Sequence, residues 1–256
     1  MGPQAAPGRT LSERADALEE HMMHELEHIV TRSVFANLAD GHVEMDSGAD
    51  LMKQNPGKLM LMGEDPRLPK MPEKPTLVDY FRCRFASTAH LLQSGTHALK
   101  AGHNEKVILA CLLHDIAVVG FIRCDHGYWG AQMIEPYVDE EVSWAIKTHQ
   151  ALRFFPDEEA GYPYPEVYRK WFGEDYQPEP YIVDEYQRAR NHKHYMTSRL
   201  ICVNDIYSFD PNAKVNLDDF VDIIGRNFKQ PKEGLGWDNS PSAHMWRTIM
   251  WPSRFL

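Results

Sequence analysis

A histidine–aspartate pair at the end of the most apolar segment most constrains how this chain can fold. His114 and Asp115 directly follow the run from Val107 to Leu113, which Asn104 can cap as a helix. Burying an imidazole beside a carboxylate costs free energy unless each group is paired or coordinates a metal ion. The pair is therefore either a structural ion pair of the core or part of a metal site.

Four further residues of the same types lie in other apolar segments. They are His90, His126, His149 and Asp205. Imidazoles and carboxylates held on rigid helices form a mixed nitrogen and oxygen ligand set, which suits iron, manganese or zinc and fits two adjacent ions better than one. With all six residues expected on helices, the sequence predicts a dinuclear metal centre rather than an isolated ion pair.

Helical periodicity dominates the chain, and strand signals are nearly absent, so we expect an all-α fold. The expected helices cover residues 11–40, 76–101 and 104–117, and others begin at Asp125, at Asp139, near Pro180, near Lys193 and at Asn216. The aromatic and proline-rich segment 162–180 between two helices is either surface packing or a lid over a pocket.

The length of 256 residues favours one domain with additions. Residues 1–75 are expected to form an N-terminal helix and a connecting segment packed on the core. Residues 76–256 then form the domain with the six candidate ligands and the C-terminal helices.

Charge and composition narrow the partners and the compartment. A formal net charge of -10 speaks against nucleic acid and anionic membranes. There is no apolar window of about 18 residues that could span a bilayer. The four cysteines form no CxxC pair, which favours a reducing compartment. We therefore expect a cytoplasmic protein whose partner is a small substrate or another protein.

Over about residues 77–211 the sequence resembles the HD-domain superfamily. The signature of that superfamily is a His, a His-Asp dipeptide and a distal Asp, with two more His in its dinuclear members. The local pattern HxxxGA occurs at His126, Gly130 and Ala131, and a basic residue, Arg153, follows His149 by four positions. Within the superfamily the sequence is most similar to the mixed-valent diiron oxygenases that cleave hydroxylated aminoalkyl phosphonates, and more distantly to myo-inositol oxygenase. The resemblance implies an HD-domain helical bundle with an N-terminal helical extension.

The resemblance also implies an assignment of metal ligands. His90, His114 and Asp205 would hold one ion, His126 and His149 the other, and Asp115 would bridge them as a catalytic residue. The ions would be an Fe²⁺/Fe³⁺ pair, with manganese or zinc as other options. The reactants would be O2 and a small hydroxylated molecule.

Four residues near the expected centre carry further expectations from the resemblance. Tyr80 stands where the phosphonate oxygenases have a tyrosine that occupies an iron until substrate arrives, although a packed helix tyrosine is the other interpretation. Arg153 replaces their substrate-binding lysine. Cys83 and Cys202 replace an acidic residue and an arginine, which leaves fewer anion-binding groups and makes a phosphonate substrate doubtful.

Arg199 is a candidate for substrate binding on other grounds, because it precedes Asp205 by only six residues. It could hold an anionic part of a substrate, or it could form an ordinary salt bridge.

Two enzyme classes use such ligands, and a non-enzymatic metal-binding or interaction protein is a third possibility. The first class is a diiron oxygenase that cleaves or oxidises a small hydroxylated substrate, and the second is a metal-dependent phosphohydrolase that acts on a phosphate ester. Few cations lie near the candidate ligands, and the sequence has no glycine-rich phosphate loop. These features speak against a nucleotide as the substrate, and of the two classes we expect the oxygenase.

Overall fold

The structure of the chain is a computed structural model that describes residues 10, 13–17, 20, 69–70, 72, 76–85, 88–119, 125–210 and 212–229. Within these residues the secondary structure is helical, and the one β-type pairing is an isolated bridge between Asp157 and Tyr162. The predicted all-α class is confirmed. None of the helices in these ranges has the length and apolar content to cross a membrane.

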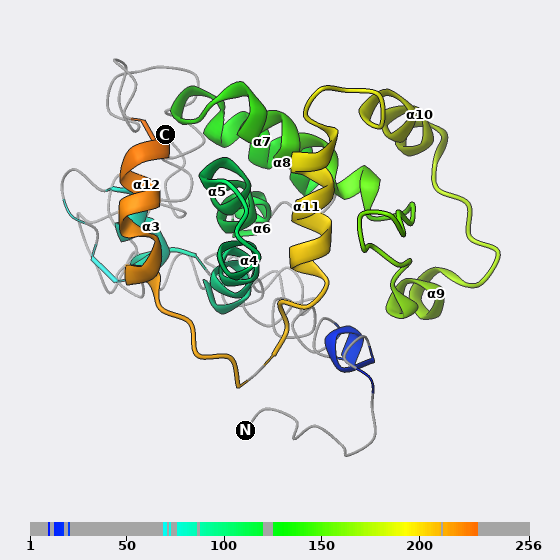
Figure 1. Ribbon diagram of the computed structural model, residues 1–256, viewed down its shortest axis with the longest axis horizontal. Helices are drawn as coiled ribbons and strands as arrows, with labels where there is room; N and C mark the ends of the chain where they lie inside the picture. The colour runs from blue at the N-terminus through cyan, green and yellow to red at the C-terminus, as the bar shows by residue number, and fades with distance from the viewer. Residues whose placement is uncertain are drawn as a thin grey trace, which may run out of the picture.

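The helices form a layered bundle around a central pair (Figure 1). The α-helices are α3 (Leu77–Cys83), α4 (Thr88–Lys100), α5 (Glu105–Leu113), α6 (Ile116–Val119), α7 (His126–Ile134), α8 (Glu140–Leu152), α9 (Glu166–Phe172), α10 (Pro180–Ala189), α11 (Tyr195–Asp205) and α12 (Val221–Asn227), and the 3-10 helices are η2 (Glu135–Tyr137) and η3 (Leu217–Phe220). Helices α4 and α5 pack together, α11 packs against α4, α5 and α8, and α7 packs against α8.

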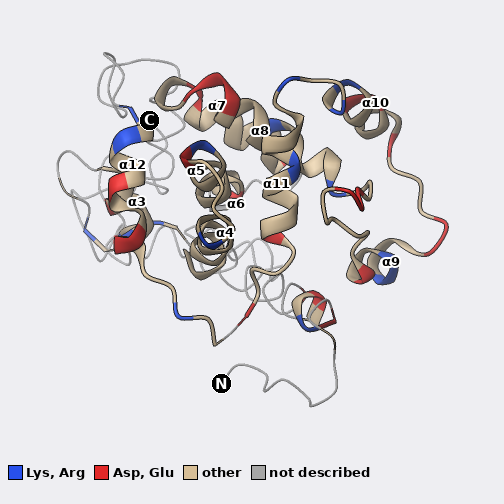
Figure 2. Cartoon of the chain, viewed as in Figure 1, with Lys and Arg blue, Asp and Glu red and all other residues tan. Residues whose placement is uncertain are grey.

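Helix α5 is the centre of this bundle because its sequence is apolar on every face. The side chain of Asn104 caps the helix by accepting hydrogen bonds from the backbone N–H groups of Lys106 and Val107, at 3.0 and 3.1 Å. All residues from Val107 to Leu113 are buried. The charges of α5 lie in its first turn alone, as Figure 2 shows, so the rest of the helix can contact α4, α8, α11 and α12.

The expectation of one helix over residues 76–101 is wrong, because α3 ends at Cys83 and α4 begins at Thr88. The hydroxyl of Thr88 donates to the carbonyl oxygens of Phe85 and Phe81, at 2.9 and 3.2 Å. These bonds satisfy carbonyls that a continuous helix would pair with its own N–H groups. The apolar periodicity on both sides of the break is helical, so periodicity alone does not reveal the break.

The helix expected over residues 104–117 is also interrupted. Helix α5 ends at Leu113, His114 and Asp115 form a turn, and the short helix α6 follows. The expectation that all six candidate ligands lie on helices is therefore wrong for His114 and Asp115, which lie in a turn.

Other expected helix starts agree closely with the structure. Asp125, Asp139 and Asn216 occupy the N-cap positions of α7, α8 and η3. Helix α10 begins at Pro180, and α11 begins at Tyr195.

Two parts of the chain fit the expectations less completely. Helix α9 was not expected, since its residues fall within the aromatic and proline-rich segment 162–180. Of the helix expected over residues 11–40, residues 13–17 and 20 are described and are helical. The rest of that helix lies outside the described residues.

Removing one side chain from the centre of the bundle tests this packing. Leu112 is fully buried in α5, and its Cδ2 atom would be only 2.7 Å from a Cβ atom added at Gly95 of α4. We expect Leu112→Ala to lower the free energy of unfolding by about 2 to 5 kcal/mol, because the cavity cannot collapse fully. Leu99→Ala is the control, since Leu99 is 39% exposed, and a change within about 0.5 kcal/mol is expected there. Urea unfolding followed by circular dichroism measures both, and equal losses would contradict the described packing.

Candidate metal centre

The structure brings the six candidate ligands together in two adjacent groups of three. One group is His90, His114 and Asp205, and the other is Asp115, His126 and His149. In each group the possible ligand atoms all lie within 4.8 Å of one another, and all six residues are buried. They come from α4, the α5–α6 turn, the first residue of α7, α8 and the last residue of α11.

In the first group the donor atoms form a compact triangle. The Nε2 atom of His90 lies 3.2 Å from Nε2 of His114 and 3.0 Å from Oδ1 of Asp205, and Nε2 of His114 lies 3.4 Å from the same oxygen. Two donors that each lie about 2.1 Å from one ion, at angles of about 90° to 110°, are about 3.0 to 3.4 Å apart. The triangle therefore has the dimensions of one face of a metal coordination sphere.

The second group has a similar but more open arrangement. Nε2 of His126 lies 3.1 Å from Nε2 of His149 and 3.3 Å from Oδ1 of Asp115. The distance from Nε2 of His149 to Oδ1 of Asp115 is longer, at 3.9 Å. Two of the three distances fit a shared ion directly, and the third requires a small movement of one side chain.

Hydrogen bonds to backbone carbonyls determine which nitrogen of three histidines faces inward. The Nδ1 atoms of His90, His114 and His149 contact the carbonyl oxygens of Ser208, Cys111 and Ile146, at 3.1, 2.8 and 2.6 Å. A carbonyl oxygen only accepts, so each Nδ1 donates, and a neutral ring then has a bare lone pair on Nε2. Backbone hydrogen bonds of this kind also orient histidines that bind metals.

Facing lone pairs repel each other unless a cation lies between them. The Nε2 atoms of His90 and His114 face each other at 3.2 Å. This distance is that of a hydrogen bond, which needs a proton between the two atoms, or of two nitrogens bound to one metal ion. Oδ1 of Asp115 and Oδ1 of Asp205 are buried there, and neither has a hydrogen-bond partner among the described residues. The chemistry of this donor set therefore fits bound metal ions.

Protonation of one histidine can supply the positive charge when no metal ion is bound. Burial lowers the pKa of His90, but the adjacent carboxylates of Asp115 and Asp205 raise it to about 10. Burial also lowers the pKa of His149, and the nearby imidazoles of His126 and His114 oppose a further positive charge there, so its pKa lies well below the usual range. His149 is thus held neutral, with its Nε2 lone pair ready to bind a cation.

Both carboxylates stay ionised in this environment. Burial would raise the pKa of Asp115, yet its histidine neighbours hold it well below its usual range. The same holds for Asp205, where the guanidinium of Arg153 makes the largest contribution against burial. Two buried negative charges beside four imidazoles favour binding of divalent or trivalent cations.

Asp115 lies between the two groups. Its Oδ2 atom is 3.5 Å from Nε2 of His90 in the first group, and its Oδ1 atom is 3.3 Å from Nε2 of His126 in the second. Oδ1 is also 3.5 Å from Nε2 of His114 in the first group. The carboxylate therefore contacts donors of both groups, as a bridging carboxylate needs.

Arg153 lies at the edge of the centre. Its Nη2 atom is 3.5 Å from Oδ2 of Asp205, and its guanidinium lies 5.3 Å from the centre of the Tyr168 ring. Arg153, which directly follows α8, therefore contacts a candidate ligand on α11 and a tyrosine on α9. Its role in substrate binding stays a prediction.

Arg199 has contacts typical of a structural residue. It is fully buried, and its guanidinium donates to the hydroxyl of Tyr195 and the carbonyl oxygen of Leu152, at 3.1 and 3.0 Å. Its Nε atom also lies 3.5 Å from a carboxylate oxygen of Asp157. These contacts favour a role in joining α8 to α11 over the expected contact with substrate.

Tyr80 is fully buried in the main core. Its ring lies 6.3 Å from that of Phe85, and burial, with Tyr137 nearby, raises the pKa of its hydroxyl. This environment favours the packing interpretation of Tyr80, and its expected catalytic role stays a prediction.

Two glycines that sequence reasoning did not explain allow α7 to approach its neighbours. A Cβ atom at Gly127 would lie 2.8 Å from the carbonyl oxygen of Ile146 and 3.3 Å from Cε1 of His149. At Gly130 it would lie 3.3 Å from Cγ2 of Ile116. Gly127 in particular brings His126 within reach of His149. Its position directly after a candidate ligand is the one sequence signal that could have pointed to it.

Comparisons with known proteins add no assignment to this geometry. No protein-family model matches the sequence, and a search of curated proteins gave no significant match.

A methyl group at Gly127 tests whether the close approach of α7 and α8 builds the second group. The backbone of Ile146 cannot move aside as a flexible side chain could, so we expect Gly127→Ala to cost about 1 to 3 kcal/mol of stability. It should also weaken metal binding by the second group. Gly225→Ala is the matched control, because a Cβ atom there has nothing within 4 Å and alanine favours a helix. Thermal unfolding and metal titration measure both effects, and a Gly127→Ala protein as stable as Gly225→Ala would refute the explanation.

Proposed function

We propose that this chain is an HD-domain dinuclear metalloenzyme, specifically a diiron oxygenase that cleaves or oxidises a small hydroxylated substrate with O2. One observation carries the proposal. The carboxylate of Asp115 lies within 3.5 Å of imidazole nitrogens from two separate groups of buried donors, and in these groups Nε2 atoms face each other at 3.2 and 3.1 Å. A single ion or a structural ion pair would leave one of these groups unexplained.

The donor set supports iron as the metal. Four imidazoles and two carboxylates provide no thiolate, and such a set suits iron, with manganese and zinc as other occupants. His90, His114 and Asp205 would hold one ion, His126 and His149 the other, and Asp115 would bridge them. A pair of iron ions would supply one-electron chemistry with O2, which no side chain of the chain can supply by itself.

The chain's own residues position and insulate this centre. The carbonyls of Ser208, Cys111 and Ile146 hold three imidazole rings in one orientation, so little reorganisation accompanies binding. The burial of all six residues excludes bulk water, which protects a reactive centre from side reactions. One ion would have three protein donors and the shared carboxylate, and the other two donors and the shared carboxylate, so both would keep positions open for a substrate hydroxyl and for O2.

The cations near the centre favour a hydroxylated substrate over a phosphate ester. Arg153 contacts Asp205, whereas Arg199 is engaged with Tyr195, Leu152 and Asp157. Charge-assisted hydrogen bonds from Arg or Lys strengthen the binding of a phosphate group, and of these two arginines Arg153 is the one beside the centre. Arg153 would instead hold Asp205 in place and attract a single negative group of the substrate.

The bridging role of Asp115 can be tested by counting metal ions. We expect two iron ions per chain in protein purified without oxygen, and at most one in Asp115→Ala, because without the bridge two cations repel each other. Asp184→Ala is the matched control, since Asp184 is an exposed residue of α10. Elemental analysis of the three proteins gives the answer, and two ions retained in Asp115→Ala would exclude the bridge.

The reaction class is tested by supplying both kinds of substrate with and without O2. We expect O2 uptake in step with product for at least one of a panel of hydroxylated small molecules. A mixed-valent electron paramagnetic resonance signal should change when that molecule is added. A panel of phosphate esters serves as the comparison. Turnover of a phosphate ester under strict anaerobiosis, with no O2 uptake on any compound, would assign the protein to the phosphohydrolases.

A further inference from the structure

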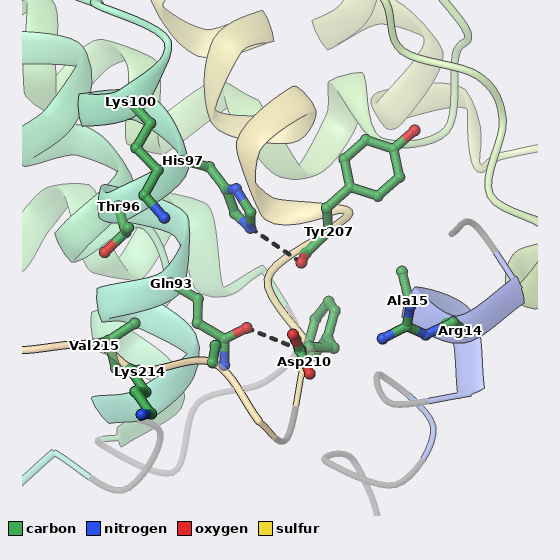
Figure 3. Close-up of a pocket in the computed structure, with 12 residues that line it drawn as sticks. Arg14, Ala15, Gln93, Thr96, His97, Lys100, Tyr207, Asp210, Lys214 and Val215 are labelled. Atoms are coloured by element: carbon green, nitrogen blue, oxygen red, sulfur yellow. Dashed lines mark hydrogen bonds between the residues drawn. The ribbon is translucent and has the colours of Figure 1, made fainter. Parts of the chain in front are cut away.

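A cavity of about 330 Å³ lies beside the candidate metal centre and is not part of it. Figure 3 shows its walls, which come from residues 13–17, from α4 and from the segment that follows α11. Its volume is at the lower end of the range that small-molecule sites occupy, about 300 to 1,000 Å³. The cavity can therefore hold a small organic molecule.

The charge of the cavity is opposite to that of the whole protein. Arg14, Lys100 and Lys214 line it, and Asp210 is the acidic residue among the lining side chains. The complete chain has a formal net charge of -10. A local excess of cations on an acidic protein concentrates anions at that place and not elsewhere.

Polar groups of the lining supply directed hydrogen-bond donors. Oε1 of Gln93 accepts from the backbone N–H of Asp210 at 2.8 Å, so the amide nitrogen of this buried side chain is on the other side of the amide group (Figure 3). The Nε atom of Arg14 is buried and has no hydrogen-bond partner among the described residues. Donors beside cations suit a carboxylate or a phosphate group.

Apolar side chains complete the walls. Ala15, Phe209 and Val215 line the same cavity. They offer an apolar surface to the rest of a bound molecule, which a bare inorganic ion could not use.

The wall of the cavity also contacts a candidate metal ligand. The ring of Phe209 stacks on that of His90, with centroids 4.4 Å apart and an interplanar angle of 18°. The preceding residue, Ser208, accepts the hydrogen bond from Nδ1 of His90. The segment that lines the cavity is thus the segment that orients His90.

We propose that this cavity is a second ligand site, which binds a small organic anion through its carboxylate or phosphate group, and that Phe209 couples its occupancy to the orientation of His90. The site differs from the proposed substrate position, because Arg14, Lys100 and Lys214 line it, whereas Arg153 lies beside the metal centre. Binding at this site does not require metal ions.

Calorimetric titration of the full-length, metal-free chain tests the binding. The probes are benzoate, phenyl phosphate, inorganic phosphate and the uncharged benzyl alcohol. We expect one benzoate or phenyl phosphate per chain, bound at least tenfold more tightly than inorganic phosphate or benzyl alcohol. The tighter of the two organic anions identifies the preferred group.

Matched variants locate the binding. The double variant Lys100→Gln/Lys214→Gln should weaken it at least tenfold, whereas Lys147→Gln/Lys193→Gln removes the same charge on and beyond α8 and should leave it unchanged. Failure of every anion to bind, or equal affinity in the two double variants, would overturn the proposal.

The coupling has its own readout in the same metal-free protein. The ring ¹⁵N resonances of His90, assigned by their loss in His90→Gln, should shift when the organic anion saturates the site. The shift should be at least halved in Phe209→Leu, which keeps an apolar wall. Unchanged His90 resonances at saturation would overturn the coupling. Because no metal is present, these results are independent of whether the oxygenase proposal succeeds.

Discussion

The arrangement of this protein depends on balancing the charge of six buried polar groups. Four imidazoles and two carboxylates lie together in an apolar bundle, where unbalanced groups of this kind would be strongly unfavourable. Backbone carbonyls direct imidazole lone pairs inward, and the carboxylates add negative charge. Arg153 supplies one positive charge beside Asp205, and a proton on His90 or bound metal ions would supply more. The packing of α4, α5, α8 and α11 brings the six groups so close together that their charges have to be balanced.

Close helix packing and the polar centre depend on each other. Gly95 and Gly127 remove the side chains that would hold α4 away from α5 and α7 away from α8. At such short distances a shift of one helix changes the separation of two candidate ligands. The same residues that make the core dense therefore set the geometry of the site, so stability and ligand geometry cannot vary independently.

Much of this arrangement could be predicted from the sequence, because the relevant signals are local. The apolar residues before His114 indicated burial of the His-Asp pair, and side chains such as Asn104 and Asp139 marked helix starts. The break before Thr88 could not be predicted, since it depends on hydrogen bonds to carbonyls of the preceding turn. Arg199 precedes Asp205 in the same helix, yet its side chain contacts Asp157 and Tyr195, a choice made by tertiary packing. The cavity combines residues 13–17, α4 and the segment after α11, which no sequence pattern connects.

The order of the ligands along the chain has a consequence for synthesis. Asp115, His126 and His149 all precede α9, whereas the group of His90 and His114 is completed by Asp205, which lies 56 positions after His149 (205 − 149). A chain emerging from the ribosome therefore presents all three donors of the second group while the first group still lacks Asp205. During that interval Asp115 already has His90 and His114 on one side and His126 and His149 on the other. If metal ions bind during synthesis, the second group is the first to offer its full set of donors, and the order of loading would follow the direction of translation.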